Sequence, residues 1–155
     1  MALKWPWSKQ PAKQLLKAQF WACVFLTHDD FEAFIEEDDD FYSIENEEAE
    51  NPIPLSRFAG SQGETSYDHD FMEVGQVGSS DDPNIAISAS YSEFWAEEFM
   101  RRARDAGIEP THFIMVGIDR PPNAREYRQF GNPVSVEGEG YSLIYLGEIE
   151  HEDYP

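Results

Sequence analysis

The run QFWACVFL, residues 19–26, constrains the fold more than any other feature of the sequence. Seven consecutive residues of this run are apolar, and three of them are aromatic. A short, continuous apolar run with aromatic and β-branched residues is typical of a strand that is buried on both faces of a sheet. We therefore predict a central strand here, which needs partner strands from elsewhere in the chain.

A first helix is predicted immediately after this strand, over residues 28–37. Thr27 is the expected N-cap, because its hydroxyl can accept a hydrogen bond from the backbone N–H of Asp30. Phe31, Phe34 and Ile35 then have the i, i+3, i+4 spacing that gives a helix one apolar face.

The second helix is predicted over residues 91–106. Ser90 and Glu93 have the spacing of a capping box, and Gly107 is the expected helix stop. Its apolar face is traced by Phe94, Trp95, Phe99 and Ala103.

Four further strands are predicted from short apolar runs between turn residues, at positions 70–77, 84–90, 111–119 and 141–149. The order strand, helix, strands, helix, strand, strand indicates an α+β fold. We expect a four- or five-stranded mixed or antiparallel sheet with two main helices packed on one face. Residues 1–18 hold four lysines and no acid, so we assign them to a basic N-terminal appendage and residues 19–155 to a single domain.

The charge of the chain restricts its partners. Its 31 acidic and 11 basic residues give a net charge of -20, and residues 28–50 hold 12 acids with no lysine or arginine. Such a chain repels nucleic acids and anionic membranes and attracts basic partners. We therefore expect no nucleic-acid or membrane partner.

The cysteine content and the apolar runs indicate where the protein resides. Cys23 is the one cysteine, so no internal disulfide can form, which suits a reducing cytoplasm. No segment approaches the roughly 20 apolar residues that span a bilayer, and the run near the N-terminus lacks the features of a signal peptide. We expect a soluble, cytoplasmic protein.

The segment SYDHDFMEV, residues 66–74, is the strongest candidate for a site. On a strand, Asp68 and Asp70 would project from one side and His69 from the other, so two of the three could share a metal ion. Nearby acids fit no complete ligand set. An EF-hand frame starting at Glu36 has Phe41 where the sharp turn needs glycine.

The sequence contains no recognisable catalytic motif. None of its serines lies in a nucleophile elbow, the four histidines are scattered, and the glycines match neither a Walker loop nor a dinucleotide fingerprint. We therefore predict no enzyme activity and no cofactor. Two interpretations of the acids and aromatics remain open: a solvated surface that keeps the protein soluble, and a docking surface for a basic protein.

The segment LSRFAGSQGETSYDHDFMEV resembles the marker segment of the immunity protein 22 family of bacterial polymorphic toxin systems. The similarity extends over about residues 19–119 and is most specific at YDHDF. The first strand departs from the family pattern, because a tryptophan followed closely by a glycine is expected and FWACVFLTHDD contains no glycine.

The resemblance implies an antidote that binds and blocks a cognate toxin in the cytoplasm of the producing cell. Toxins of such systems are often nucleases with basic clefts, which an anionic surface would fit. We accordingly expect a basic toxin domain as the partner, and the partner-binding residues predicted are Asp38, Asp39, Asp40, Tyr42, Asp68 and Asp70.

Two alternatives remain open at this point. One is a metal-dependent hydrolase that uses Asp68 and Asp70, and the other is a DNA-mimicking inhibitor of another nucleic-acid-binding protein. A further interpretation assigns the two aspartates of the motif a structural role as caps of a neighbouring loop. The sequence does not indicate an oligomeric state.

Overall fold

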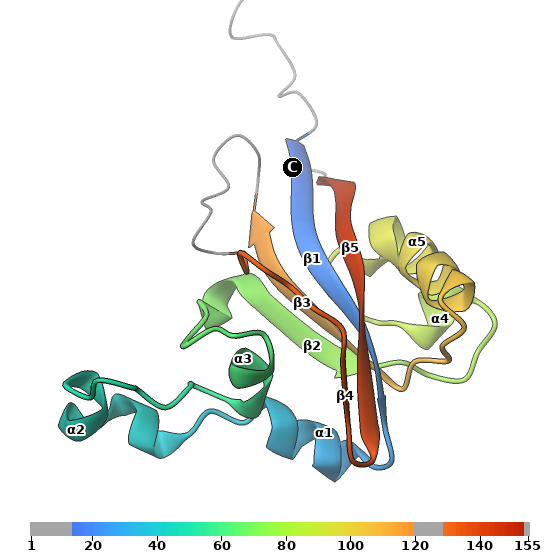
Figure 1. Ribbon diagram of the computed structural model, residues 1–155. Helices are drawn as coiled ribbons and strands as arrows, with labels where there is room; N and C mark the ends of the chain where they lie inside the picture. Colours follow the sequence, from blue (N-terminus) through green and yellow to red (C-terminus); the bar gives the residue numbers. More distant parts are fainter. Residues whose placement is uncertain (1–13, 120–128, 154–155) are drawn as a thin grey trace, which may run out of the picture.

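The computed structural model describes residues 14–119 and 129–153. In this part of the chain, five strands form one sheet in the order β2-β3-β1-β5-β4, and each neighbouring pair is antiparallel (Figure 1). The strands are β1 (Gln14–Phe25), β2 (Met72–Gln76), β3 (His112–Asp119), β4 (Val136–Gly138) and β5 (Tyr141–Asp153). The predicted α+β class is confirmed, and the sheet is antiparallel throughout.

The predicted central strand is β1, which pairs with β3 on one side and β5 on the other. It begins at Gln14, which pairs with Asp153, so the predicted domain boundary at residue 18 falls inside a strand. Residues 14–18 therefore belong to the sheet. The rest of the predicted appendage, residues 1–13, lies outside the described residues.

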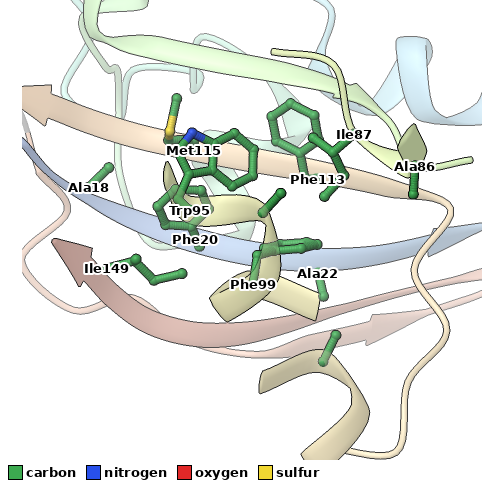
Figure 2. Packing of buried hydrophobic residues seen from close by; sticks show 12 residues of the cluster. Ala18, Phe20, Ala22, Ala86, Ile87, Trp95, Phe99, Phe113, Met115 and Ile149 are labelled. Atoms are coloured by element: carbon green, nitrogen blue, oxygen red, sulfur yellow. The ribbon is translucent and has the colours of Figure 1, made fainter. Parts of the chain in front are cut away.

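One face of the sheet is covered by α5 (Ser92–Asp105), with α4 (Pro83–Ala86) beside it (Figure 1). Trp95 and Phe99 of α5 pack against Phe20 of β1, with ring centroids 4.9 and 6.0 Å from that of Phe20. Phe113 of β3 contacts the same tryptophan at 5.3 Å. Figure 2 shows these rings gathered between the helix and the sheet.

The opposite face is covered by α1 (His28–Ile35) and α3 (Arg57–Ser61). Phe31, Phe34 and Phe58 of these helices belong to a second buried cluster with Trp21 of β1. The predicted placement of both main helices on one face is therefore wrong. Consecutive aromatic residues of β1 point to opposite faces, so each face needs its own cover.

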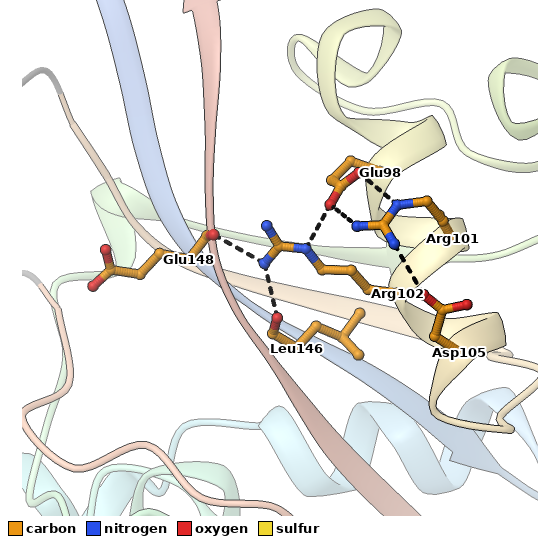
Figure 3. Close-up of polar contacts among 6 residues, drawn as sticks. All are labelled: Glu98, Arg101, Arg102, Asp105, Leu146 and Glu148. Carbon is orange, nitrogen blue, oxygen red and sulfur yellow. Dashed lines mark hydrogen bonds and ion pairs between the residues drawn. The ribbon is translucent and has the colours of Figure 1, made fainter.

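An arginine on α5 attaches this helix to an irregular point of β5 (Figure 3). Arg102 donates hydrogen bonds to the backbone carbonyls of Leu146 and Glu148, at 2.9 and 3.0 Å. Between them, Gly147 has a φ of 91°, a left-handed conformation that favours glycine. Hydrogen bonds from Arg101 and Arg102 lower the pKa of Glu98 to about 2.

Of the two predicted helix starts, the cap of the first is confirmed and that of the second is wrong. The Thr27 hydroxyl accepts from the Asp30 N–H at 3.1 Å and caps α1, which ends at Ile35 rather than at residue 37. The second predicted helix is α5. Its predicted capping box is wrong, because the N-cap is Tyr91 in a left-handed conformation with no side-chain cap hydrogen bond.

Two strand predictions are also wrong. Residues 84–90 do not form a strand, since α4 begins at Pro83 and its N-cap Asp82 accepts from the Asn84 N–H. A proline at the first helical position and an aspartate before it favour a helix start. The short edge strand β4 was not predicted. No helix in the described residues has the length and apolar character needed to cross a membrane.

Candidate functional site

A polar segment that we call the acidic lobe, residues 36–56, connects α1 to α3. It contains a 3₁₀ helix, η2 (Asp39–Tyr42), and the short helix α2 (Ile44–Glu47), which Figure 1 shows beyond α3, away from the sheet. Asp38 caps η2 by accepting the Asp40 N–H at 2.9 Å, and Ser43 caps α2 by accepting the Asn46 N–H at 3.1 Å. These caps explain how an acid-rich segment acquires a defined backbone.

A groove with a volume of about 630 Å³ lies along this lobe. One wall is made by consecutive acids, and among the described residues Arg57 is the one basic residue in the lining. The guanidinium of Arg57 lies 5.4 Å from the ring centroid of Phe34 and 5.8 Å from that of Tyr141, so aromatic rings orient it. The lining residues are Ala33, Glu36, Glu37, Asp38, Asp39, Asp40, Ile53, Pro54, Ser56 and Arg57.

The DHD motif, which is residues 68–70, does not have the predicted strand geometry. Residues His69–Phe71 form a 3₁₀ helix, η3, and β2 begins only at Met72. Asp68 caps η3 by accepting the Asp70 N–H at 3.1 Å, so the two carboxylates do not project together from a strand. The physical reason is the aspartate itself, whose side chain bonds to the backbone two residues on and stabilises a turn in place of a strand.

Glu37 joins the two acidic segments that the sequence suggested separately. One of its carboxylate oxygens lies 3.2 Å from His69 Nδ1, and the other accepts a hydrogen bond from the Tyr42 hydroxyl at 3.2 Å. Tyr67 adds a second connection, since its hydroxyl lies 3.2 Å from Ser56 Oγ. The motif at residues 67–70 therefore lies next to the acidic lobe.

The six predicted residues separate into three groups. The aspartates 38–40 line the groove, and Tyr42, which is 62% exposed, lies just beyond it. Asp68 and Asp70 are not among the groove residues and adjoin the lobe through His69. Asp68 is engaged as a cap, whereas the Asp70 side chain is exposed and lies 3.7 Å from His69 Nε2.

Sequence reasoning missed Glu36, Glu37, Arg57 and Ile44. The two glutamates lie within an acidic run, but nothing in that run indicates which of its acids line the same groove as residues 53–57. Ile44 is 72% exposed in a polar helix. An isolated isoleucine among glutamates is the signal that could have marked it as an exposed apolar residue.

Two other chemical groups of interest lie elsewhere. In the described ranges, no three His, Cys, Asp or Glu side chains come together as metal ligands. The Cys23 thiol is buried in β1, and this burial raises its pKa, so it lies among core side chains in its thiol form.

The structure does bring two of the scattered histidines together. His28 Nδ1 lies 3.0 Å from Nε2 of His112, which is only 4% exposed and whose Nδ1 lies 2.8 Å from the Thr111 hydroxyl. Glu32 lies 2.8 Å from the other nitrogen of His28. Phe31 stacks on the His112 ring at a centroid distance of 4.0 Å. The burial of the His112 ring favours its neutral form.

The stability of the fold is expected to fall as the pH drops below about 6.5, the ordinary pKa of histidine. Burial and the neighbouring His28 lower the pKa of His112 to about 4. The unfolded chain therefore binds more protons between these values, and the expected loss from pH 7.5 to pH 5 is about 2 kcal/mol. Urea unfolding at both pH values measures this loss.

His112→Gln should remove most of the pH-dependent difference in stability. The control His69→Gln, at an exposed site, should keep the difference. Equal pH dependence in both variants would contradict the assignment to His112.

No protein-family model, no curated protein and no solved structure matches this chain. The immunity-family resemblance of residues 19–119 therefore stays a prediction from the sequence.

Proposed function

We propose that the chain is a cytoplasmic immunity protein that binds a cognate bacterial toxin through the acidic lobe and blocks it without catalysis. The observation that carries the proposal is the groove, which the consecutive acids Glu36 to Asp40 line together with Arg57. A basic toxin surface would exchange its counterions and water for these carboxylates. The resemblance of residues 55–74 to an immunity family supports the same conclusion.

We assign different roles to the two aspartates of the DHD motif. Asp68 caps the turn that carries His69, and His69 contacts Glu37, so the role that we assign to Asp68 is structural. Asp70 is exposed and carries its charge toward solvent beside the lobe. A surface charge at the rim of an interface changes chiefly the association rate and its salt dependence.

The proposal is tested by toxin binding and neutralisation with two single variants. The toxin is the product of the neighbouring gene, co-expressed with the full chain, and growth and affinity are the readouts. Asp68→Ala is expected to lower the free energy of unfolding by about 1 kcal/mol, the typical value of a cap, with toxin affinity retained. Asp70→Ala is expected to weaken toxin binding severalfold at low salt without changing the melting temperature.

The control for both variants is Asp105→Ala, which removes one exposed acid on α5, at the opposite face of the sheet. It should leave toxin affinity unchanged. If the neighbouring protein neither binds the unaltered chain nor loses its toxicity in co-expression, the immunity function is wrong. Capture of a housekeeping nucleic-acid enzyme in its place would favour the DNA-mimic alternative.

A further inference from the structure

An apolar cleft is lined by the segment that follows the acids of the groove in the chain. It has a volume of about 360 Å³ and lies between the segment 41–47 and residues 52 and 65. The groove lies between residues 36–40 and 53–57, so successive stretches of the same two segments line the two hollows. The cleft is lined by Phe41, Tyr42, Ser43, Asn46, Glu47, Pro52 and Thr65.

The walls of this cleft are held together by one buried amide. The side chain of Asn46 donates to the Phe41 carbonyl at 3.0 Å and accepts from the Ile53 N–H at 2.7 Å. Two backbone hydrogen bonds of 2.7 Å, from Asp38 to Leu55 and from Leu55 to Thr65, fix the second segment. A cleft with fixed walls binds without first paying for its own ordering.

The apolar atoms of the cleft are open to solvent at its edge. Tyr42 is 62% exposed, its ring meets that of Phe41 edge-on at 5.1 Å, and the next apolar side chain, Ile44, is 72% exposed. Exposed aromatic and aliphatic side chains beside a preformed hollow are the usual place for an anchoring side chain of a partner.

The surrounding charge identifies the kind of partner. Acids flank the cleft on both sides along the chain, at residues 36–40 and 45–50, and residues 28–56 contain no lysine or arginine. A second copy of this chain would bring another net charge of -20 to the same place. Like charges in contact are unfavourable, so a basic segment is the complementary occupant.

We propose that cleft and groove together bind one cationic segment of a protein partner, whose single large apolar side chain enters the cleft while its Lys or Arg residues lie along Glu36 to Asp40. The inference rests on the proposed function for the nature of the partner, a protein. It adds the sequence pattern that the partner must present: an apolar anchor with basic residues on at least one side.

The test uses two labelled peptides of lysine and serine that differ only at the centre, tryptophan in one and alanine in the other. Their binding to the full chain is measured by fluorescence anisotropy. The tryptophan peptide is expected to bind about tenfold more tightly, as for an anchor in a desolvated pocket. Tyr42→Ser should abolish this preference, whereas Ile85→Ser, which removes a 72% exposed isoleucine on α4, should preserve it.

Two outcomes would overturn the inference. Equal affinity of both peptides means that charge alone binds them. A molar mass that doubles with concentration in light scattering means that a second copy covers the cleft. Toxin neutralisation is measured separately, so an anchored peptide without neutralisation contradicts only the proposed function.

Discussion

Replacing Phe58 with alanine is expected to lower the free energy of unfolding by about 3–5 kcal/mol, the usual cost of deleting a buried aromatic ring. Phe58 is fully buried on α3 and contacts the rings of Trp21 and Phe130, at centroid distances of 5.2 and 5.5 Å. The surrounding rings belong to β1, to α1 and to two loops, so they cannot close the cavity unless these elements move. Denaturant unfolding with the linear extrapolation measures the change.

A matched variant separates global stability from the order of the acidic lobe. Phe99→Ala deletes an equally buried ring on α5, at the opposite face, and should cost a similar amount. Only Phe58→Ala should speed hydrogen exchange in residues 36–56, because α3 ends the lobe and Phe58 also lies near the ring of Phe34. A stability loss below about 1 kcal/mol for Phe58→Ala would contradict the packing role assigned to this ring.

The central strand could be predicted from sequence because its signal is continuous. Each position from Phe20 to Cys23 is fully buried, which matches the apolar run that indicated a strand covered on both faces. The same logic required cover on two sides, but apolar spacing within a helix does not say which face of a sheet the helix meets. The opposite positions of α1 and α5 follow from the alternation of Phe20 and Trp21 in β1.

The candidate site was only partly predictable. Its acids are visible in the sequence, and Asp38, Asp39 and Asp40 do line one groove. The contact between the lobe and the DHD motif depends on Glu37 and His69, which are separated by 32 positions and show no shared pattern. The motif itself was misread as a strand because Asp68 and Asp70 alternate, whereas the Asp68 side chain closes a turn.

Removing three groove charges is expected to slow association with the toxin about tenfold or more at low salt, the range typical of electrostatic steering. The variant combines Glu36→Gln, Asp39→Asn and Asp40→Asn, whose carboxylates line the groove. None of these side chains serves as a cap among the described contacts, so the fold should be unchanged. Stopped-flow mixing with the toxin, at low and at high salt, measures the rate.

The control variant removes the same number of charges from the α5 side, by Asp81→Asn, Glu97→Gln and Glu109→Gln. Each variant neutralises three acids and so changes the net charge from -20 to -17. A field that acts through net charge alone would slow both equally, and such a result would contradict steering by the groove. Salt screens exposed charges beyond about 8 Å at physiological ionic strength. At that ionic strength, only charges close to the docking position should affect the association rate. The groove variant alone should therefore associate more slowly with the toxin, and its association rate should depend less on salt.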